Sequence, residues 1–260
     1  MQSQAINKQY KTGLALSGGA ARGFAHLGVF RALHEHGIIP DIISGVSAGS
    51  LAGAFYCDGY TPEEILSTFD NSKIFNFVKL NFNRRGLFNP VGLRNHLKKH
   101  LRATRIEELK VPLLITATDL NTGKTTIFSE GDLVTALMAS SCIPVIFRPV
   151  EYNGATYIDG GITNNFPIEP LTQICDRVIG VHVNPVGSYS PKWGLIQTGL
   201  YSFHLSISSL INKKKEQIDL FIEPQELTNY TYHDIEGRHK MYEIGYTETI
   251  KVLEQKKDFH

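Results

Sequence analysis

The chain has 260 residues, of which 42% are hydrophobic and 20% are charged, and 26 basic against 25 acidic side chains leave a net charge of +1. A chain this apolar and this close to neutral can bury a core, so its composition excludes a protein that is mainly disordered. The near-zero charge provides no global field to attract nucleic acid, so we expect no nucleic-acid partner.

Strands and helices alternate along a single predicted domain, which we expect to span residues 13–260 after a polar tail over residues 1–12. The predicted elements are, in chain order, a strand at 13–16, a helix at 24–37, a strand at 41–44, helices at 51–57 and from 61, a helix at 90–101, strands at 111–118 and 125–128, a helix at 132–144, strands at 150–152 and 155–157, strands at 177–183 and 218–222, and a helix at 237–257. This alternation indicates an α/β fold with a mostly parallel sheet.

Local sequence signals predict the start of one helix, one hairpin turn and one insertion between elements. Thr61-Pro62-Glu63-Glu64 has the sequence of a capping box, which begins a helix. Asn153-Gly154 between two short apolar runs is the strongest short-range signal for a β-hairpin, and this hairpin leads to Asp159. Residues 71–89 mix aromatic and basic side chains without a helical or strand period, so we expect an insertion there.

The segment Gly45-Val46-Ser47-Ala48-Gly49 matches the pattern G-x-S-x-G between a short strand and a helix of small residues. Glycines at Gly45 and Gly49 allow a strand to turn sharply into a helix, which places the serine in a strained and exposed position. Ser47 is therefore the candidate nucleophile. The alternative interpretation is a plain glycine turn in which Ser47 only caps a helix.

A second glycine-rich loop follows the first predicted strand and consists of Gly18, Gly19, Ala20, Ala21, Arg22 and Gly23. Consecutive small residues allow backbone N–H groups to converge on an anion, so this loop is a candidate oxyanion hole or phosphate cradle. The lysine of a Walker loop is absent and the dinucleotide fingerprint is imperfect, which leaves nucleotide binding as the alternative. Arg22 could orient the loop through carbonyl groups or meet a phosphate head group.

Asp159 ends a predicted strand and is followed by Gly160 and Gly161, which allow another backbone or a substrate to approach closely. Its carboxylate is a candidate base for the hydroxyl of Ser47. The competing candidate is an imidazole: His182, at a strand end, fits the order Ser, Asp, His of α/β-hydrolases. The simpler interpretation of His182 is a strand histidine whose ring is hydrogen-bonded within the fold. We interpret His26, one turn after the glycine loop, as a packing residue or one that supports the site without touching the substrate.

Together these three motifs resemble the patatin-like phospholipase family, in its bacterial branch. The matching residues are Leu16-Ser17-Gly18-Gly19-Ala20-Ala21-Arg22-Gly23 with Phe24-Ala25-His26-Leu27-Gly28-Val29, then Gly45-Val46-Ser47-Ala48-Gly49, then Asp159-Gly160-Gly161 with Asn164-Asn165-Phe166-Pro167. The resemblance covers about residues 12–184. It implies a three-layer α/β/α fold and a Ser-Asp dyad in which Ser47 attacks a lipid ester, Asp159 acts as base and residues 18–23 form the oxyanion hole.

One residue departs from the family pattern, because the third glycine of the loop is Ala20 here. Alanine keeps the backbone N–H but does not readily adopt a positive φ, so we expect the hole to survive only if this position needs no such conformation. The implied activity is that of a phospholipase A, lysophospholipase or carboxylesterase without metal or cofactor. Acyl transfer through the same acyl-enzyme, and a non-catalytic nucleotide- or lipid-binding module, are the alternatives.

The remaining features concern the surroundings of such a site. The aromatic and basic residues at 75–88 could contact a membrane surface, and the apolar stretch at 193–210 could wall an acyl pocket or form a homodimer surface. The simpler interpretation of both segments is covered core, because single aromatic residues commonly anchor a core. The run Lys213-Lys214-Lys215 is most simply solvated, with a patch for anionic lipid as the alternative. No apolar run approaches the roughly 18–20 residues of a membrane-spanning helix, so we expect a cytoplasmic protein, with membrane association through such a surface as its further possibility.

Overall fold

The structure is a computed structural model that describes residues 8–70, 90–144, 147–187 and 211–256, together with a few residues between 194 and 208. The predicted insertion at 71–89 and most of the apolar stretch at 193–210 lie outside the described residues. The alternatives for these two segments, namely a membrane contact, an acyl-pocket wall or dimer surface, and core packing, therefore stay predictions.

The described strands are β1 (Tyr10–Leu16), β2 (Ile42–Val46), β3 (Leu113–Asp119), β4 (Lys124–Phe128), β5 (Val150–Tyr152), β6 (Ala155–Asp159), β7 (Cys175–Val181) and β8 (Leu220–Ile222). They form one sheet in the order β5-β6-β3-β2-β1-β7-β8, and β4 pairs with β3 outside this path. Strands β3, β2, β1, β7 and β8 run parallel, whereas β4, β5 and β6 join through antiparallel pairs. The predicted mostly parallel sheet with an added hairpin is confirmed.

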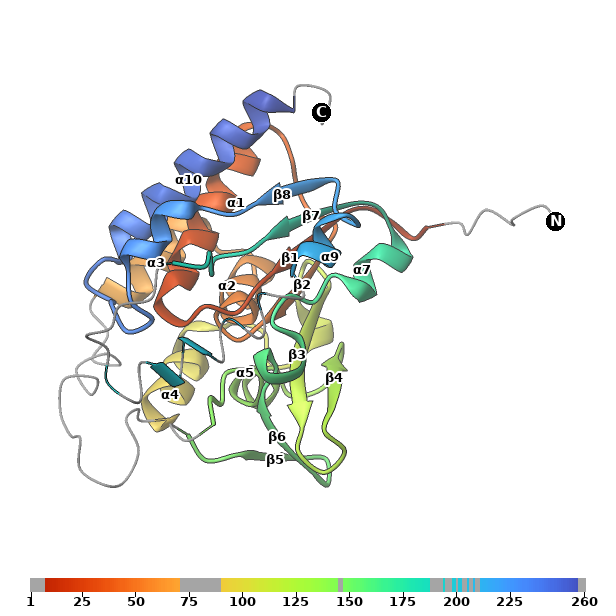
Figure 1. Ribbon diagram of the computed structural model, residues 1–260. Helices are drawn as coiled ribbons and strands as arrows, with labels where there is room; N and C mark the ends of the chain where they lie inside the picture. The colour runs from red at the N-terminus through yellow and green to blue at the C-terminus, as the bar shows by residue number, and fades with distance from the viewer. Residues whose placement is uncertain are drawn as a thin grey trace.

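The described helices are α1 (Ala25–Glu35), α2 (Ala48–Cys57), α3 (Pro62–Asp70), α4 (Pro90–His100), α5 (Leu133–Ser140), α6 (Gly161–Asn164), α7 (Glu169–Ile174), α9 (Ile211–Lys215) and α10 (Arg238–Gln255), with 3₁₀ helices η1 (Ala20–Phe24), η3 (Ile106–Glu108) and η4 (Gln225–Asn229). Helices lie on both faces of the sheet (Figure 1), which confirms the three-layer α/β/α fold.

Side chains that alternate along β1 show the two cores. Leu14 and Leu16 belong to the larger core, to which α1, α2, α5 and α10 also contribute buried residues. Ala15 points to the smaller core on the opposite face, beneath α7 and α9. Both faces of the central strands are therefore buried, as expected for strands that read as continuous apolar runs.

The predicted local signals form as their chemistry requires. The N–H of Thr61 donates to Glu64 Oε2 (2.8 Å) and the N–H of Glu64 donates to Thr61 Oγ1 (3.2 Å), so the capping box begins α3. Asn153 and Gly154 both have positive φ, 49° and 78°, as in the two-residue turn that joins β5 to β6. Gly37, with φ 68°, follows the end of α1.

Some boundaries differ from the predicted ones. Strand β1 begins at Tyr10 rather than at residue 13, because Tyr10 already pairs with Cys175 of β7. Helix α5 ends at Ser140 rather than near Pro144, since the carbonyls of Ser140 and Cys142 accept hydrogen bonds from Gly160 and Asp159 instead of continuing the helix. The short helices α6, α7 and α9 have no counterpart in the predicted elements.

The lysine run at 213–215 is only partly solvated. Lys214 Nζ donates to Asn164 Oδ1 and to the carbonyl of Phe166, both at 2.7 Å, and pairs with Glu169 Oε1 at 2.7 Å. Its side chain is 15% exposed. Lys214 therefore ties α9 to the segment that follows Asp159 and Gly160, and a simple solvated run is the wrong description of this residue.

Strand β3 explains how residues far apart in the chain come together. Strand β4 occupies one side of β3 along residues 115–119. Strand β2 occupies the other side along 113–116, and β6 takes over that same side at 117–119. The ends of β2 and β6 thus meet: Val46 lies opposite Thr116 and Asp159 lies opposite Ala117. Ser47 is the next residue after Val46, so the register of the sheet brings it to Asp159.

Candidate active site

The turn from β2 into α2 holds Ser47 in a strained conformation. Its φ of 51° and ψ of −123° lie outside the regions favoured by residues with a side chain, at a cost on the order of 1–3 kcal/mol. The turn needs both of its glycines: a Cβ at Gly49 would overlap the carbonyl oxygen of Leu16, and one at Gly45 would lie 2.8 Å from the backbone of Gly49. The backbone geometry is that of a nucleophile elbow.

The hydroxyl of Ser47 donates a hydrogen bond of 2.7 Å to Asp159 Oδ2. The other carboxylate oxygen, Oδ1, accepts from the N–H of Gly161 at 2.8 Å. Both side chains are buried. Burial raises the pKa of Asp159 to about 6, although its hydrogen bonds with Ser47 and Gly161 act in the opposite direction. The sheet thus pairs a serine with a carboxylate that is more basic than an exposed one.

Two further serines support this turn, and no local sequence pattern indicates either of them. Ser140 Oγ accepts from the N–H of Ser47 at 2.9 Å and donates to the carbonyl of Thr116 at 2.7 Å. Ser50 Oγ donates to the carbonyl of Ser47 at 2.7 Å. The bond between Ser140 and Ser47 joins residues 93 positions apart, and no local pattern in α5 marks Ser140 as a partner of the turn. These bonds hold the strained backbone in place.

The glycine-rich loop lies beside Ser47, since a Cβ at Gly18 would sit 3.3 Å from Ser47 Cβ. Several of its N–H groups are already bonded: that of Gly18 to the carbonyl of Asn165, that of Ala21 to the carbonyl of Tyr232, and that of Arg22 to the carbonyl of Gly19. Within the described part of the chain, the N–H groups of Gly19 and Ala20 make no hydrogen bond. The two amides that remain available for an anion are therefore consecutive.

Ala20 adopts the conformation that we expected an alanine to avoid. Its φ is 48°, in the left-handed region, and it lines the same pocket as Ser47. An L-residue with a Cβ occupies this region at a cost of about 1–2 kcal/mol. The position therefore does need a positive φ, and the loop keeps its shape with an alanine under strain. The glycines at 160 and 161 pack closely too: a Cβ at Gly160 would overlap the carbonyl oxygen of Thr116.

Arg22 is buried, and its guanidinium contacts the segment around Tyr230. Its Nε and Nη2 both donate to the carbonyl of Tyr230, at 2.9 Å and 2.8 Å, and its guanidinium lies 4.5 Å from the ring centre of Tyr232. Burial lowers its pKa, and the neighbouring Tyr232 opposes this shift. Of the two roles considered for Arg22, these contacts favour orienting the loop over meeting a head group.

The two histidines named from the sequence have other partners. His182 Nδ1 lies 2.9 Å from Glu223 Oε1, at the end of β7. His26 Nε2 donates to the carbonyl of Ser17 at 2.9 Å, and burial lowers the pKa of His26 to about 4. Neither ring makes a hydrogen bond to Ser47 or Asp159. The geometry thus favours Asp159 over His182 as the partner of the serine.

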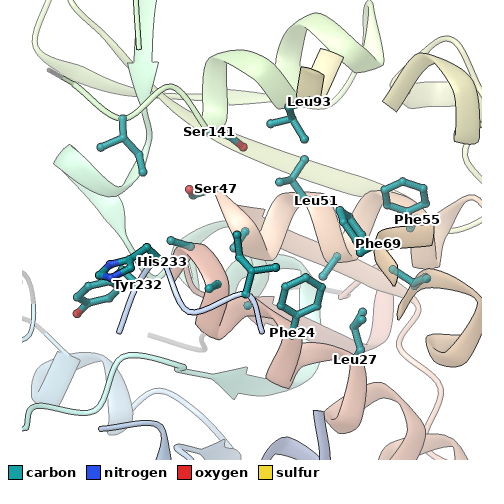
Figure 2. Close-up of a pocket in the computed structure, with 18 of the residues that line it drawn as sticks. Phe24, Leu27, Ser47, Leu51, Phe55, Phe69, Leu93, Ser141, Tyr232 and His233 are labelled. Atoms are coloured by element: carbon teal, nitrogen blue, oxygen red, sulfur yellow. The ribbon is translucent and has the colours of Figure 1, made fainter. Parts of the chain in front are cut away.

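An apolar pocket opens at Ser47 (Figure 2). It has a cavity volume of about 180 Å³, many times the space that one water molecule needs. Its lining comes from η1, α1, α2, α3 and α4 and from the segments around Ser141 and Tyr232. Ser47 and Ala20 thus both line a cavity suited to a hydrocarbon chain. No cluster of three or more metal-ligating side chains occurs within the described ranges.

The chain is similar to several known proteins. The family model described as Patatin-like phospholipase matches residues 14–172. An uncharacterized NTE family protein of Mycobacterium tuberculosis, Rv1063c, is 31% identical over 177 residues, which are 67% of this chain and 49% of that protein. The probable lipid hydrolase 463L of invertebrate iridescent virus 6 is 35% identical over 217 residues, 75% of this chain and 72% of that protein. The chain spans about half the length of the mycobacterial relative.

Among solved structures, that of VipD from Legionella pneumophila is similar, with a TM-score of 0.53 over 95% of this chain and 67% of that one. The sequences are 17% identical, so this likeness concerns the fold alone.

In the described parts of the chain, no helix is both long and apolar enough to cross a membrane.

Proposed function

Because the chain belongs to the patatin-like phospholipase family, we propose that it is a serine acyl hydrolase that cleaves lipid esters through Ser47 and Asp159. The observation that carries the proposal is the 2.7 Å hydrogen bond from the Ser47 hydroxyl to the Asp159 carboxylate at the wall of an apolar pocket. A hydroxyl so placed can lose its proton to the carboxylate as it attacks an ester bound in the pocket.

The reaction has two halves. In the first, Ser47 Oγ attacks the ester carbonyl carbon while Asp159 takes the hydroxyl proton. The tetrahedral intermediate then collapses, the leaving alkoxide takes the proton from Asp159, and an acyl-serine remains. In the second half a water molecule attacks the acyl-serine, again giving its proton to Asp159, and the returned proton regenerates the Ser47 hydroxyl as the fatty acid leaves.

Electrostatics of the loop assist both tetrahedral intermediates. The unbonded N–H groups of Gly19 and Ala20 are the donors available to the developing oxyanion. In comparable sites, removal of one such donor raises the activation free energy by about 3–4 kcal/mol. Ser47 also precedes the first turn of α2, whose N-terminus favours negative charge nearby. A carboxylate with a pKa of about 6 is ionised at neutral pH and accepts a proton more readily than an ordinary one.

The pocket indicates the class of substrate. Its interior is lined by side chains such as Leu27, Leu51 and Phe55, which suit an alkyl chain, whereas Tyr232 and His233 provide polar atoms at another part of the lining. A lipid ester has both parts, an acyl chain and a polar remainder. We therefore propose phospholipids, lysophospholipids and related esters as substrates, with acyl transfer to an alcohol as the alternative fate of the same acyl-serine.

The test combines two substitutions with a covalent probe. Ser47→Ala and Asp159→Asn should each lower kcat/KM for a short-chain nitrophenyl ester by at least about a thousandfold, with the fold unchanged by circular dichroism. A fluorophosphonate should label the unaltered protein once, at Ser47. The matched control is Ser44→Ala, a buried serine of β2, the strand that precedes Ser47, which does not line the pocket; this variant should keep both labelling and turnover.

The alternatives predict different results. A non-catalytic nucleotide- or lipid-binding module would show no labelling at Ser47 together with saturable nucleotide or lipid binding. An α/β-hydrolase arrangement would lose turnover in His182→Ala and tolerate Asp159→Asn. Full activity in Asp159→Asn would contradict the proposed dyad.

A further inference from the structure

Helix α2 begins at the candidate nucleophile and then runs along the pocket. Four of the lining residues, Ala48, Leu51, Ala52 and Phe55, lie on one face of this helix at the spacing i, i+3, i+4 and i+7. Figure 2 shows α2 leading away from Ser47, with Phe55 at the far end of the drawn lining and Tyr232 and His233 on the opposite side of Ser47. Position along α2 therefore corresponds to distance from Ser47 into the pocket.

This face combines small and large side chains. Ala48, next to Ser47, and Ala52, half-way along the face, leave room for a ligand, and Leu51 lies between them. At the far end stands Phe55, which is fully buried. Its ring packs edge-on against Phe69 with 6.1 Å between ring centres, and Phe69 packs against Phe24 at 5.4 Å. All three rings line the pocket, so an aromatic cluster closes the end that Phe55 occupies.

The distance along α2 from Ser47 to Phe55 can be compared with the length of an extended alkyl chain. Phe55 follows Ser47 by eight positions, and at a rise of about 1.5 Å per residue this corresponds to about 12 Å. A fully extended chain advances by roughly 1.2 Å per bond, from about 3.5 Å for the three bonds of one residue. About ten bonds therefore match the stretch of α2 from Ser47 to Phe55.

We propose that Phe55 limits the length of the acyl chain in this pocket to about ten carbons. The inference rests on the proposed function, because it requires that the acyl group attached to Ser47 lies along α2. It assigns Phe55 as a specificity-determining residue for that reaction. Ala52, half-way along the same face, sets the opposite limit: a larger side chain there occupies the space that the middle of the acyl chain would fill.

The experiment measures kcat/KM across nitrophenyl esters from butanoate through octanoate, decanoate and laurate to palmitate. The unaltered protein should be most active near decanoate and at least about tenfold less active on palmitate. Phe55→Leu should move the optimum toward laurate and palmitate by about two to three carbons, since a leucine side chain is shorter than a phenyl ring. Ala52→Leu should move the optimum in the other direction, to octanoate or shorter.

The matched control is Phe30→Leu, the same exchange at a buried phenylalanine of α1. Phe30 is stacked on Tyr56 and does not line the pocket, so this variant should lose stability without any change in the preferred chain length. Ala52→Leu adds volume inside an existing cavity and therefore decides the matter even if Phe55→Leu fails to fold.

The possible outcomes distinguish the chain-length limit at Phe55 from the proposed hydrolase activity. Opposite shifts in Phe55→Leu and Ala52→Leu, with none in Phe30→Leu, support Phe55 as the limit. An unchanged chain-length profile in Ala52→Leu, with fluorophosphonate still labelling Ser47, overturns the limit and leaves the proposed hydrolase standing. Absence of both labelling and hydrolysis in the unaltered protein overturns both.

Discussion

Strained backbone gathers at the candidate site at the scale of single residues. Three non-glycine residues of the described chain have a positive φ, and two of them, Ala20 and Ser47, line the same pocket. Each is held by bonds from elsewhere in the chain: Ser140 bonds the N–H of Ser47, and the carbonyl of Tyr232 accepts the N–H of Ala21, next to Ala20. Strain of this kind persists only where the surroundings over-determine the backbone.

Replacing Ala20 by glycine should therefore stabilise the protein by about 0.5–1 kcal/mol, because relief of the left-handed strain exceeds the added chain entropy of glycine. Urea unfolding of the two proteins measures the difference, and activity should be retained because the N–H is unchanged. Ala21→Gly is the matched control: Ala21 has no positive φ, so this neighbour should lose about 0.5–1 kcal/mol. A loss of stability in Ala20→Gly would contradict the strain argument.

The candidate residues differ in how far the sequence could predict them. Ser47 and the loop at 18–23 follow from local glycine patterns, since a sharp turn and converging amides need small residues wherever they occur. Ser140 and Ser50 could not be predicted, because their role is defined only by the carbonyl and amide groups that the fold brings to them. The positive φ of Ala20 was likewise invisible, as an alanine by itself does not indicate a left-handed backbone.

At the scale of elements, the crossing of α1 and α10 anchors the glycine-rich loop, because η1 leads directly into α1. The helices touch backbone to backbone: a Cβ at Gly245 would overlap the carbonyl oxygen of Ala25, and one at Gly28 would overlap that of Tyr242. The segment before α10 adds the carbonyls of Tyr230 and Tyr232, which bind Arg22 and Ala21. The C-terminal part of the chain thus holds the loop that would receive the oxyanion.

Gly245→Ala should consequently destabilise the protein by about 1–3 kcal/mol or more, because the two helices must separate to admit the methyl group. Thermal or urea unfolding measures the change. Gly92→Ala on α4 is the control, since a Cβ there meets no heavy atom of the described chain within 4 Å; this variant should gain about 0.5–1 kcal/mol from helix propensity alone. Equal effects of the two substitutions would show that close packing at Gly245 is unimportant.

Long or strongly patterned elements were predictable, and short ones were not. The capping box of α3 and the Asn153-Gly154 hairpin succeed because their signals are local hydrogen bonds and dihedral angles. Helices α6, α7 and α9 have four to six residues each, too few for an apolar period, and tertiary contacts such as those of Lys214 determine them.

For the whole molecule, burial makes stability depend on pH in two opposing ways. The pKa of His26 is lowered from 6.5 to about 4, so the stability linked to its neutral form is present above pH 6.5 and is lost as the pH falls toward 4. The pKa of Asp159 is raised from 3.8 to about 6, so the stability linked to its protonated form is present below pH 3.8 and is lost as the pH rises through 6.

Asp159→Asn removes the pH dependence that comes from the Asp159 carboxyl and keeps the one that comes from His26. At pH 7 this variant should be more stable than the unaltered protein by up to about 3 kcal/mol, and the difference should disappear as the pH falls to 4, since one pKa unit corresponds to about 1.4 kcal/mol. Urea unfolding of both proteins at pH 4, 5 and 7 measures it.

Asp70→Asn is the control with the opposite sign. Partial burial raises the pKa of Asp70, but hydrogen bonds from Arg238 and His239 outweigh it and leave that pKa below its usual value. This variant should therefore be the less stable one at pH 7. A stability difference for Asp159→Asn that does not change between pH 4 and pH 7 would contradict a buried, weakly acidic Asp159.

The alternation of apolar strands and helices predicted the mostly parallel sheet, because it permits few other arrangements, whereas the three layers were implied by the family resemblance. The sequence did not predict that β2 and β6 share one side of β3. Strand register depends on the side-chain pattern of both paired strands. Here it also depends on which part of the β3 edge the other strand leaves free for pairing, which the sequence of one strand does not indicate.

This shared side of β3 has a consequence for how the family can diverge. Ser47 and Asp159 are 112 positions apart, yet each is placed by its neighbour on β3 and not by the length of chain between them. Loops that join α2 to β3, or β3 to β6, can therefore gain or lose residues without moving either side chain. Such insertions can remodel the surroundings while the two side chains stay adjacent, whereas one residue inserted into β3 between Thr116 and Ala117 would separate them.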